Sequence, residues 1–359
     1  MDDLTVAQLN AQLETLIASI SDLDEESIEQ IQKRLDSLTK PQGSLGQLEY
    51  LAKQLGGIQR TSNPKILKKA ILLMAGDHGV VAEGVSAFPQ EVTPQMVYNI
   101  IGGGAAINVL ARHAKAEVFC TDVGVAFPLK GDIIHKRVAN GTQNMTKGPA
   151  MTRQQALQAL LVGAEVADEK IRAGYNLLAT GDLGIGNTTP SSAIVALFTN
   201  SSIELVVVRG TGIDDAGLIK KRQAIEKAIE INQPDPLDAL DVLTKVGGLE
   251  IAAIAGSILQ AAASRVPIVI DGFISTAGAL IAAKLAPKST AFMIPSHGSV
   301  EIGHRKALAE LGLDPVLNLN MRLGEGTGAA LTFHLVEAAL HILEEMSTFA
   351  DAGVSEQSS

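Results

Sequence analysis

Short apolar runs alternate with helical segments from about residue 66 onward, and each run ends in polar or glycine-rich residues. Six such runs predict strands, at residues 70–74, 118–120, 177–179, 205–208, 268–270 and 291–294. Continuous apolar strands separated by helices are typical of a buried parallel sheet with right-handed crossovers. We therefore predict an α/β fold with a mainly parallel six-stranded sheet flanked by helices.

Both ends of the chain are predicted to be helical. Apolar residues recur at helical spacing at Leu4, Leu9, Leu13, Leu16 and Ile17. A second helix is expected over residues 25–38. After a break at residues 40–43, Ser44 is expected to begin a third helix, with Gln47 completing a capping box. A last helix is expected over residues 331–346.

These patterns suggest a division of the chain. Residues 1–60 are expected to form the N-terminal part of a small helical domain, and residues 61–330 the α/β domain. The helix within residues 331–350 would pack with the small domain. The small, polar residues 351–359 are expected to be disordered.

Composition narrows the class of protein. The net charge is −10, aromatic residues make up 3% of the chain and tryptophan is absent, so binding to nucleic acid is not expected. The single cysteine, Cys120, allows no internal disulfide and suits a reducing compartment. The acidic start offers no secretory signal, and the most apolar stretch, residues 266–283, predicts a strand, a turn and a buried helix. We expect a soluble, cytoplasmic protein without membrane partners.

The glycine-rich stretch from Gly184 to Pro190 follows a predicted strand and precedes a predicted helix. Backbone amides at such a junction converge on one point and can bind phosphate. Thr188 or Thr189 could be the N-cap, with Pro190 at the first helical position. The loop lacks the lysine and the spacing of a Walker motif. The alternative is an ordinary strand-to-helix turn.

One carboxylate, Glu325, stands among the glycines at positions 324, 326 and 328, directly before a long apolar helix. Glycine permits close approach of a ligand to the backbone, and a lone acid there is a candidate general base. The alternative is a glutamate that caps the helix, since acids are favoured at helix N-termini.

Other polar positions offer weaker candidates. Ser299 could bind phosphate through its hydroxyl, whereas His297 and His304 support a zinc site only weakly. The pair Asp77 and His78 could act in acid–base chemistry or form a turn. Segments rich in alanine and glycine, at residues 102–108, 247–256 and 275–280, indicate close packing of helices or of subunits, and a homodimer is plausible on that ground.

Several motifs, in the same order along residues 35–345, resemble those of the nicotinate-nucleotide:dimethylbenzimidazole phosphoribosyltransferase family. They are Lys40–Glu49, Gly76–Gly79 continuing through Glu83–Val85, Gly184–Pro190, Lys245–Gly248, Asp271–Phe273, Pro295–His297 and Met321–Gly326. The resemblance implies a Rossmann-like sheet, a small helical domain built from the chain ends, and a homodimer.

The resemblance also implies residue roles. The general base of the family falls on Glu325. Phosphate and ribose binding falls on Gly184, Ile185, Gly186, Asn187, Thr188, Ser299 and Lys221, and the pocket for the aromatic base on Phe88, Met96 and Leu323. Asp182 stands where the family often has glutamate, one methylene longer, so only an auxiliary role is considered for it.

The implied reaction transfers the phosphoribosyl group of nicotinate mononucleotide to 5,6-dimethylbenzimidazole. The cationic nicotinate ring leaves without an acid catalyst, so one carboxylate suffices as base, and no metal or redox cofactor is expected. Two alternatives are a related ribosyl or phosphosugar transferase with another acceptor base, and a non-catalytic nucleotide-binding regulator.

Overall fold

A computed structural model of the chain describes residues 4–210, 212–298 and 301–355. Six parallel strands form one sheet in the order β3-β2-β1-β4-β5-β6. The strands are β1 (Lys69–Gly76), β2 (Glu117–Gly124), β3 (Ile134–His135), β4 (Leu177–Leu183), β5 (Ile268–Ile270) and β6 (Met293–Pro295). The predicted α/β fold with a parallel six-stranded sheet is confirmed.

One predicted strand is wrong. Residues 205–208 lie outside the sheet, partly in the short helix α8 (Ile203–Val206), and the sixth strand is instead β3. Val206 and Val208 are buried against neighbouring helices, and a short apolar run fits a buried helix as well as a strand. The edge strand β3 has only two residues, one of them exposed, and therefore left no apolar run in the sequence.

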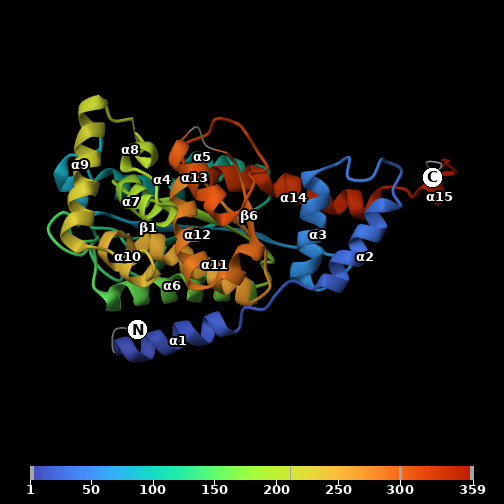
Figure 1. Cartoon of the computed structure of the whole chain (residues 1–359), viewed down its shortest axis with the longest axis horizontal. Helices are drawn as coiled ribbons and strands as arrows, with labels where there is room; N and C mark the ends of the chain where they lie inside the picture. The colour runs from blue at the N-terminus through green and yellow to red at the C-terminus, as the bar shows by residue number, and fades with distance from the viewer. Residues whose placement is uncertain (1–3, 211, 299–300, 356–359) are drawn as a thin grey trace.

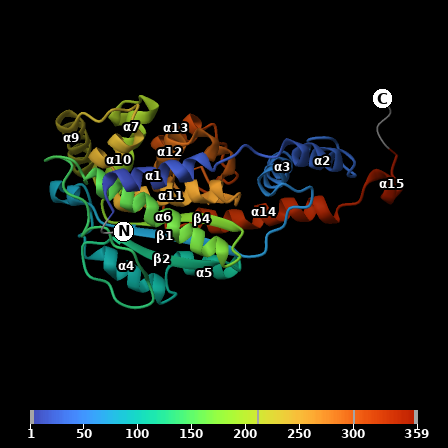
Figure 2. The same ribbon diagram turned by 90° about the horizontal axis from the view of Figure 1, so that it is seen from below.

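Helices cover both faces of the sheet, as Figures 1 and 2 show. Alternate β1 residues point to opposite faces: Leu72 packs with the first group of helices and Leu73 with the second. The first group contains α1 (Val6–Ala18), α6 (Arg153–Arg172), α7 (Thr188–Thr199), α10 (Ala239–Val246), α11 (Leu249–Ala263) and α12 (Phe273–Leu285). The second contains α2 (Glu25–Asp36), α3 (Gln47–Gln59), α4 (Val92–Ile101), α5 (Ala106–His113) and α14 (Thr327–Glu345).

The remaining elements lie at the margins of these layers. They are α9 (Asp215–Asn232), α13 (Ile302–Leu311), α15 (Phe349–Ala352) and the 3-10 turns η1 (Gly79–Glu83) and η2 (Pro287–Phe292). Within the described residues, no helix is both long and apolar enough to cross a membrane. The tail predicted to be disordered, residues 351–359, includes the end of α15, at Asp351 and Ala352. Residues 356–359 lie outside the described residues.

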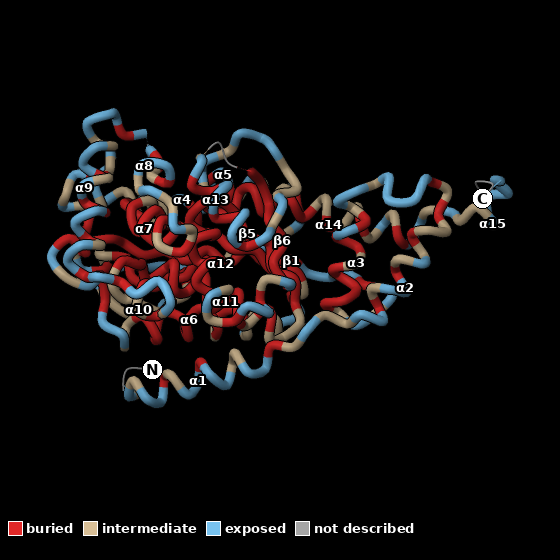
Figure 3. Tube along the Cα trace, in the orientation of Figure 1, coloured by how far each residue is buried: buried red, intermediate tan, exposed pale blue. Residues whose placement is uncertain are grey.

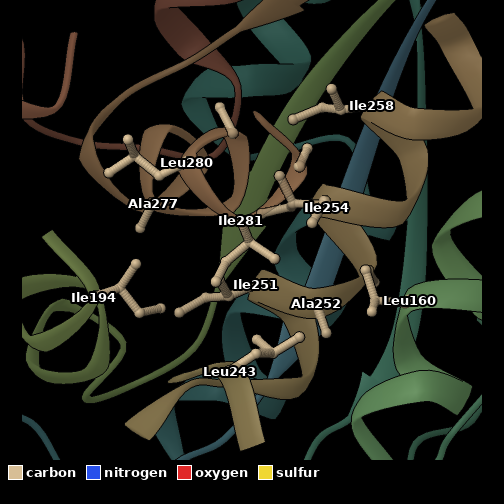
Figure 4. Close-up of a cluster of buried hydrophobic side chains, with 14 of the residues drawn as sticks. Leu160, Ile194, Leu243, Ile251, Ala252, Ile254, Ile258, Ala277, Leu280 and Ile281 are labelled. Atoms are coloured by element: carbon tan, nitrogen blue, oxygen red, sulfur yellow. The ribbon is translucent and has the colours of Figure 1, made fainter. Parts of the chain in front are cut away.

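A large core lies between the sheet and the first group of helices, where buried positions are nearly continuous (Figure 3). Within it, Ile251 and Ile254 of α11 lie next to Ile281 of α12 (Figure 4). The small residues of α11 and α12 are buried here, inside the chain. The packing of helices explains these residues, so they supply no evidence for contact between subunits.

Two glycines let α6 and α11 pack in close contact. A Cβ on Gly163 would lie 1.8 Å from the Ala253 carbonyl oxygen, and one on Gly256 would lie 1.8 Å from the Leu160 carbonyl oxygen. The Ser257 hydroxyl also donates to the Gly163 carbonyl at 3.0 Å. The backbones of the two helices therefore lie closer than any side chain would allow.

We expect Gly163→Ala to lower the free energy of unfolding by about 3 kcal/mol, because the helices must separate to admit the methyl group. Urea unfolding monitored by circular dichroism measures this change. Gly272→Ala is the control, since a Cβ there would meet no atom closer than 3.6 Å. Equal stability of the two variants would contradict the prediction.

The helices α2, α3 and α15 and the far half of α14 project from the main body (Figure 1). Arg34 of α2 donates to the Leu343 and Met346 carbonyls at the end of α14, which holds the unit together. Residues 1–60 were expected to join this unit as a whole, but the first helix does not. Helix α1 packs instead on α6 and α11 of the main body, through the buried Leu9 and Leu13.

The third helix begins later than predicted. Its N-cap is Gly46, with φ of 52°, and Ser44 lies in the preceding turn. The turn is held by Glu49, which accepts from the Leu45 amide at 3.0 Å and pairs with the Lys40 ammonium at 2.8 Å. Because Glu49 reaches back into the turn, the capping interaction predicted for Ser44 does not form.

Candidate active site

A cavity of about 520 Å³ opens at the carboxyl ends of β4, β5 and β6. Parallel α/β sheets carry their ligand sites at this edge. The lining residues come from six separate parts of the chain. They are Phe88, Val92, Met96, Asp182, Leu183, Gly184, Ile185, Asn187, Thr188, Val208, Gly210, Gly272, Phe273, Ile274, His297, Glu301, Arg322, Leu323, Gly324 and Glu325.

The loop between β4 and α7 forms one wall of the cavity. A Cβ on Gly184 would lie 1.9 Å from the Gly76 carbonyl oxygen, so the loop contacts the end of β1 directly. The N-cap of α7 is Asn187, one residue before the predicted Thr188 or Thr189, and Pro190 occupies the third helical position. The Asn187 side-chain amide donates to the Asp182 carboxyl at 3.1 Å instead of capping the helix. The first turn of α7 therefore faces the cavity without a side-chain cap.

Lys221 of α9 reaches this helix N-terminus from behind. Its ammonium donates to the Thr188 hydroxyl at 2.9 Å and to the Val208 carbonyl at 3.0 Å, and the side chain is almost completely buried. Burial lowers the pKa of Lys221 to about 8, against the opposing effect of Glu301. The lysine is thus a cation beside α7 at neutral pH, poised to lose its proton in mildly alkaline solution.

Glu325 has a left-handed backbone, with φ of 61°, between Gly324 at 82° and Gly326 at 86°. A non-glycine residue in this region costs free energy and is common at functional sites. A Cβ on Gly181 would lie 3.0 Å from the Glu325 carbonyl oxygen, so β4 supports the turn closely. The strained backbone and this support fix Glu325 at the edge of the cavity.

The carboxylate of Glu325 does not cap the helix that follows it. The N-cap of α14 is Gly326, which has no side-chain cap, and the Glu325 carboxylate instead accepts from the Ile107 amide at the start of α5. Its Oε2 atom is buried and has no hydrogen-bond partner among the described residues. Burial raises the pKa of Glu325, the Ile107 amide opposes the rise, and the Asp271 charge adds to it. The effect of burial on the pKa thus outweighs that of the Ile107 hydrogen bond.

Asp182 lies beside Glu325 in the cavity wall. Burial raises its pKa well above the usual value, and the charges of Asp271, Glu250 and Glu325 raise it further. Its Oδ1 atom has no partner in the described part of the chain. The pKa of Asp182 is thus raised more strongly than that of Glu325, which makes Glu325 the better candidate for a proton acceptor.

Asp271, at the end of β5, orients the start of α14. Its carboxylate accepts from the Gly326 amide at 3.1 Å and from the Ala329 amide at 3.0 Å. Acids at helix N-termini are stabilising for this reason. Sequence reasoning had placed Asp271 only in a motif, because the partner amides lie more than fifty residues away along the chain.

Most of the predicted site residues meet at this cavity. Phe88, Met96, Asp182, Gly184, Ile185, Asn187, Thr188, Leu323 and Glu325 line it. Gly186 belongs to the same loop without lining the cavity, and Lys221 contacts it through Thr188. Ser299 lies outside the described residues.

Among the lining residues that had not been predicted as site residues, three carry ionisable side chains: Arg322, Glu301 and His297. Arg322 and Glu301 bring opposite charges to the cavity, and burial raises the pKa of Glu301. His297 lines it too, but with a structural contact to the Ser296 hydroxyl at 3.0 Å. Arg322 lies within the motif Met321–Gly326, which could have identified it from the sequence. No motif pointed to Glu301.

The histidine candidates make buried contacts within the chain. His304 contacts the Thr276 hydroxyl at 3.0 Å, and burial lowers its pKa to about 3. Burial also lowers the pKa of His78, but the Glu250 carboxylate 2.8 Å away outweighs it and raises the pKa overall. No cluster suited to a metal ion occurs among the described residues.

At the carboxyl edge of this parallel sheet, one cavity joins a helix N-terminus, backed by a buried lysine, to a carboxylate with one unpartnered oxygen. This arrangement defines an α/β enzyme acting on small molecules. The sequence model of a phosphoribosyltransferase family matches residues 20–354. The chain belongs to this family of phosphoribosyltransferases.

Similar proteins carry a more specific name. The chain is 54% identical to the nicotinate-nucleotide–dimethylbenzimidazole phosphoribosyltransferase of Geotalea uraniireducens, over 96% of this chain and 98% of that protein. It is 53% identical to the same-named protein of Chloroflexus aurantiacus, over 96% and 99%. The crystal structure of the enzyme of that name from Thermus thermophilus superimposes with a TM-score of 0.88 at 46% identity, covering 93% of this chain and all of the other.

Proposed function

We propose that this enzyme transfers the phosphoribosyl group of nicotinate mononucleotide to 5,6-dimethylbenzimidazole, giving α-ribazole 5′-phosphate and nicotinate. The names of its relatives support this substrate pair. The observation that carries the proposal is the buried, unpartnered Oε2 of Glu325 in a cavity that also contains the N-terminus of α7.

The reaction is a single displacement at C1′ of the ribose. The free ring nitrogen of the benzimidazole forms a bond to C1′, and the bond from C1′ to the pyridinium nitrogen breaks. The electron pair of the broken bond stays on this nitrogen, so nicotinate departs with an uncharged ring. Glu325 accepts the proton from the other ring nitrogen of the benzimidazole. Attack opposite the leaving group inverts the anomeric centre to the α product.

The two ends of the cavity suit the two substrates. The first turn of α7, with the loop from Gly184 to Thr188, is the proposed phosphate site, and the Lys221 cation supports it. Phe88, Met96 and Leu323 provide apolar surface for the benzimidazole. Holding both substrates in one cavity converts a two-molecule encounter into a local step.

Asp182 has an auxiliary role in this proposal. Because burial and neighbouring carboxylates raise its pKa well above the usual value, its neutral form is favoured beside Glu325. A neutral carboxyl can instead donate a hydrogen bond into the cavity. The site then contains one base, which matches a reaction whose leaving group needs no acid.

Purified protein given nicotinate mononucleotide, with and without 5,6-dimethylbenzimidazole, tests the proposal. Nicotinate release should depend on the base, and the product should be the α anomer. Release that depends on a different acceptor would indicate a related phosphosugar transferase. Binding of the nucleotide without turnover would indicate a regulator.

Lys221→Met should raise the KM for nicotinate mononucleotide about tenfold, because it removes a buried cation from the phosphate end. In the unsubstituted enzyme, nucleotide binding should weaken as pH rises through about 8, where Lys221 loses its proton. The variant should lack this alkaline limb. Steady-state kinetics from pH 6 to 9 measure both effects, with the exposed-surface variant Lys288→Met as control. An unchanged alkaline limb in Lys221→Met would contradict the assignment.

We further propose that the protein is a homodimer in the cytoplasm. The buried free Cys120 is compatible with a reducing compartment. The projecting helical unit offers surface for a second copy (Figure 1). Analytical ultracentrifugation at micromolar concentration tests the dimer; a monomer throughout would reject it.

A further inference from the structure

Thr93 lies behind the wall of the cavity. It occupies the first turn of α4, between Val92 and Met96, which both line the cavity, and its own side chain is fully buried. Thr93 itself does not line the cavity, so it does not touch a substrate there.

The Thr93 hydroxyl joins two loops at the edge of the sheet. It donates to the Asp77 carboxylate at 2.6 Å and accepts from the Ile185 amide at 3.1 Å. Both contacts are buried. A hydroxyl has one proton and two lone pairs, so it can serve a carboxylate and an amide at once. A methyl group in its place could serve neither.

Asp77 is itself fixed in position. Its second carboxylate oxygen accepts from the Ala126 amide at 2.9 Å. Its own amide donates to the Gly124 carbonyl, and its carbonyl accepts from the Thr142 amide, both at 2.9 Å. The chain of contacts therefore runs from the ends of β1 and β2, through one hydroxyl, to the loop that precedes α7.

We infer that Thr93 is a positioning residue, whose hydroxyl holds the Ile185 amide and thereby sets the direction of the loop that binds the nucleotide phosphate. Ile185 lies in the middle of the loop from Gly184 to Thr188. A buried amide without an acceptor is unfavourable, so without the hydroxyl the loop would turn Ile185 toward another acceptor or toward water. The assignment of phosphate to this loop rests on the function proposed above.

Thr93→Val is the decisive variant, since valine keeps the shape and removes the hydroxyl. We expect the KM for nicotinate mononucleotide to rise about tenfold, while kcat at saturating substrates changes less than about threefold. Thr93→Ser, which keeps the hydroxyl, should stay within about threefold of the unsubstituted enzyme in both. Titration calorimetry of nicotinate mononucleotide should show the same loss of affinity without turnover.

Thr121→Val is the matched control. Thr121 lies in β2, is equally buried, and its hydroxyl has no partner among the described residues. This variant should leave both kinetic constants unchanged. A Thr93→Val enzyme with an unchanged KM, or a Thr93→Ser enzyme impaired as strongly as Thr93→Val, would overturn the inference.

Hydrogen exchange at the Ile185 amide can be measured on the unsubstituted protein. The result therefore depends neither on the folding of a variant nor on turnover. In the unsubstituted protein this amide should exchange slowly, because its acceptor is buried. Exchange at the rate of a free amide would reject the role of Thr93. If the unsubstituted protein releases no nicotinate in the presence of the base, the proposed function fails, while slow exchange at Ile185 would still support the contact.

Discussion

Glu325→Gln should lower kcat by about a thousandfold, because general-base catalysis contributes on the order of 10²–10⁴-fold and the glutamine amide cannot accept the benzimidazole proton. The change keeps the size of the side chain and the strained backbone of Glu325. Folding and binding of nicotinate mononucleotide should therefore be nearly unchanged. Single-turnover kinetics with calorimetric binding separate the two effects.

The acidic limb of the pH profile provides a second test of the role of Glu325. Burial raises the pKa of Glu325, so the carboxylate is lost as pH falls through a pKa higher than that of an ordinary glutamate. The value of kcat/KM should fall over that range in the unsubstituted enzyme, and the limb should be absent in Glu325→Gln. The control is Glu344→Gln, on the exposed far end of α14.

A near-normal rate in Glu325→Gln would remove the residue from the mechanism. Its contact with the Ile107 amide would then be its main role, as a cap for α5. The helix-cap alternative drawn from the sequence would hold in altered form, because the capped helix would be α5 and not α14.

Gly184→Ala should lower kcat/KM for nicotinate mononucleotide about a hundredfold and destabilise the fold by about 2 kcal/mol. The added methyl would overlap the Gly76 carbonyl oxygen, at 1.9 Å, so the loop must move away from the end of β1. That movement displaces the amides that precede α7. Thermal unfolding and steady-state kinetics measure the two effects together.

Gly298→Ala is the comparison for this variant. A Cβ there would lie 3.4 Å from the nearest atom, which is ordinary contact, and the residue has no left-handed backbone. It should keep both stability and activity. If Gly184→Ala matched it in kcat/KM, the close approach of loop and strand would have no part in binding.

The sequence predicted what depends on local pattern. Apolar strands and the polar residues that follow them indicated both the parallel sheet and the edge where the cavity lies. The lone acid among glycines pointed to Glu325 before its surroundings were known. The run at residues 205–208 failed because burial of a short apolar segment does not distinguish helix from strand.

Other features depend on contacts between distant segments and could not be predicted. Lys221 was named only through the family resemblance, because only the fold brings its ammonium to Thr188. Asn187 has a residue type suited to a cap, yet Asp182 takes its side-chain amide. The direction of the Glu325 pKa shift depends on its burial and on the Ile107 contact, and neither follows from the sequence.

Helix α14 runs without interruption from the cavity to the projecting unit. Its 19 residues span about 28 Å at the usual rise of 1.5 Å per residue. Its first turn is fastened to Asp271, and its last turn to Arg34. Because both ends are held, this helix sets the separation between the loop that contains Glu325 and the outer helices.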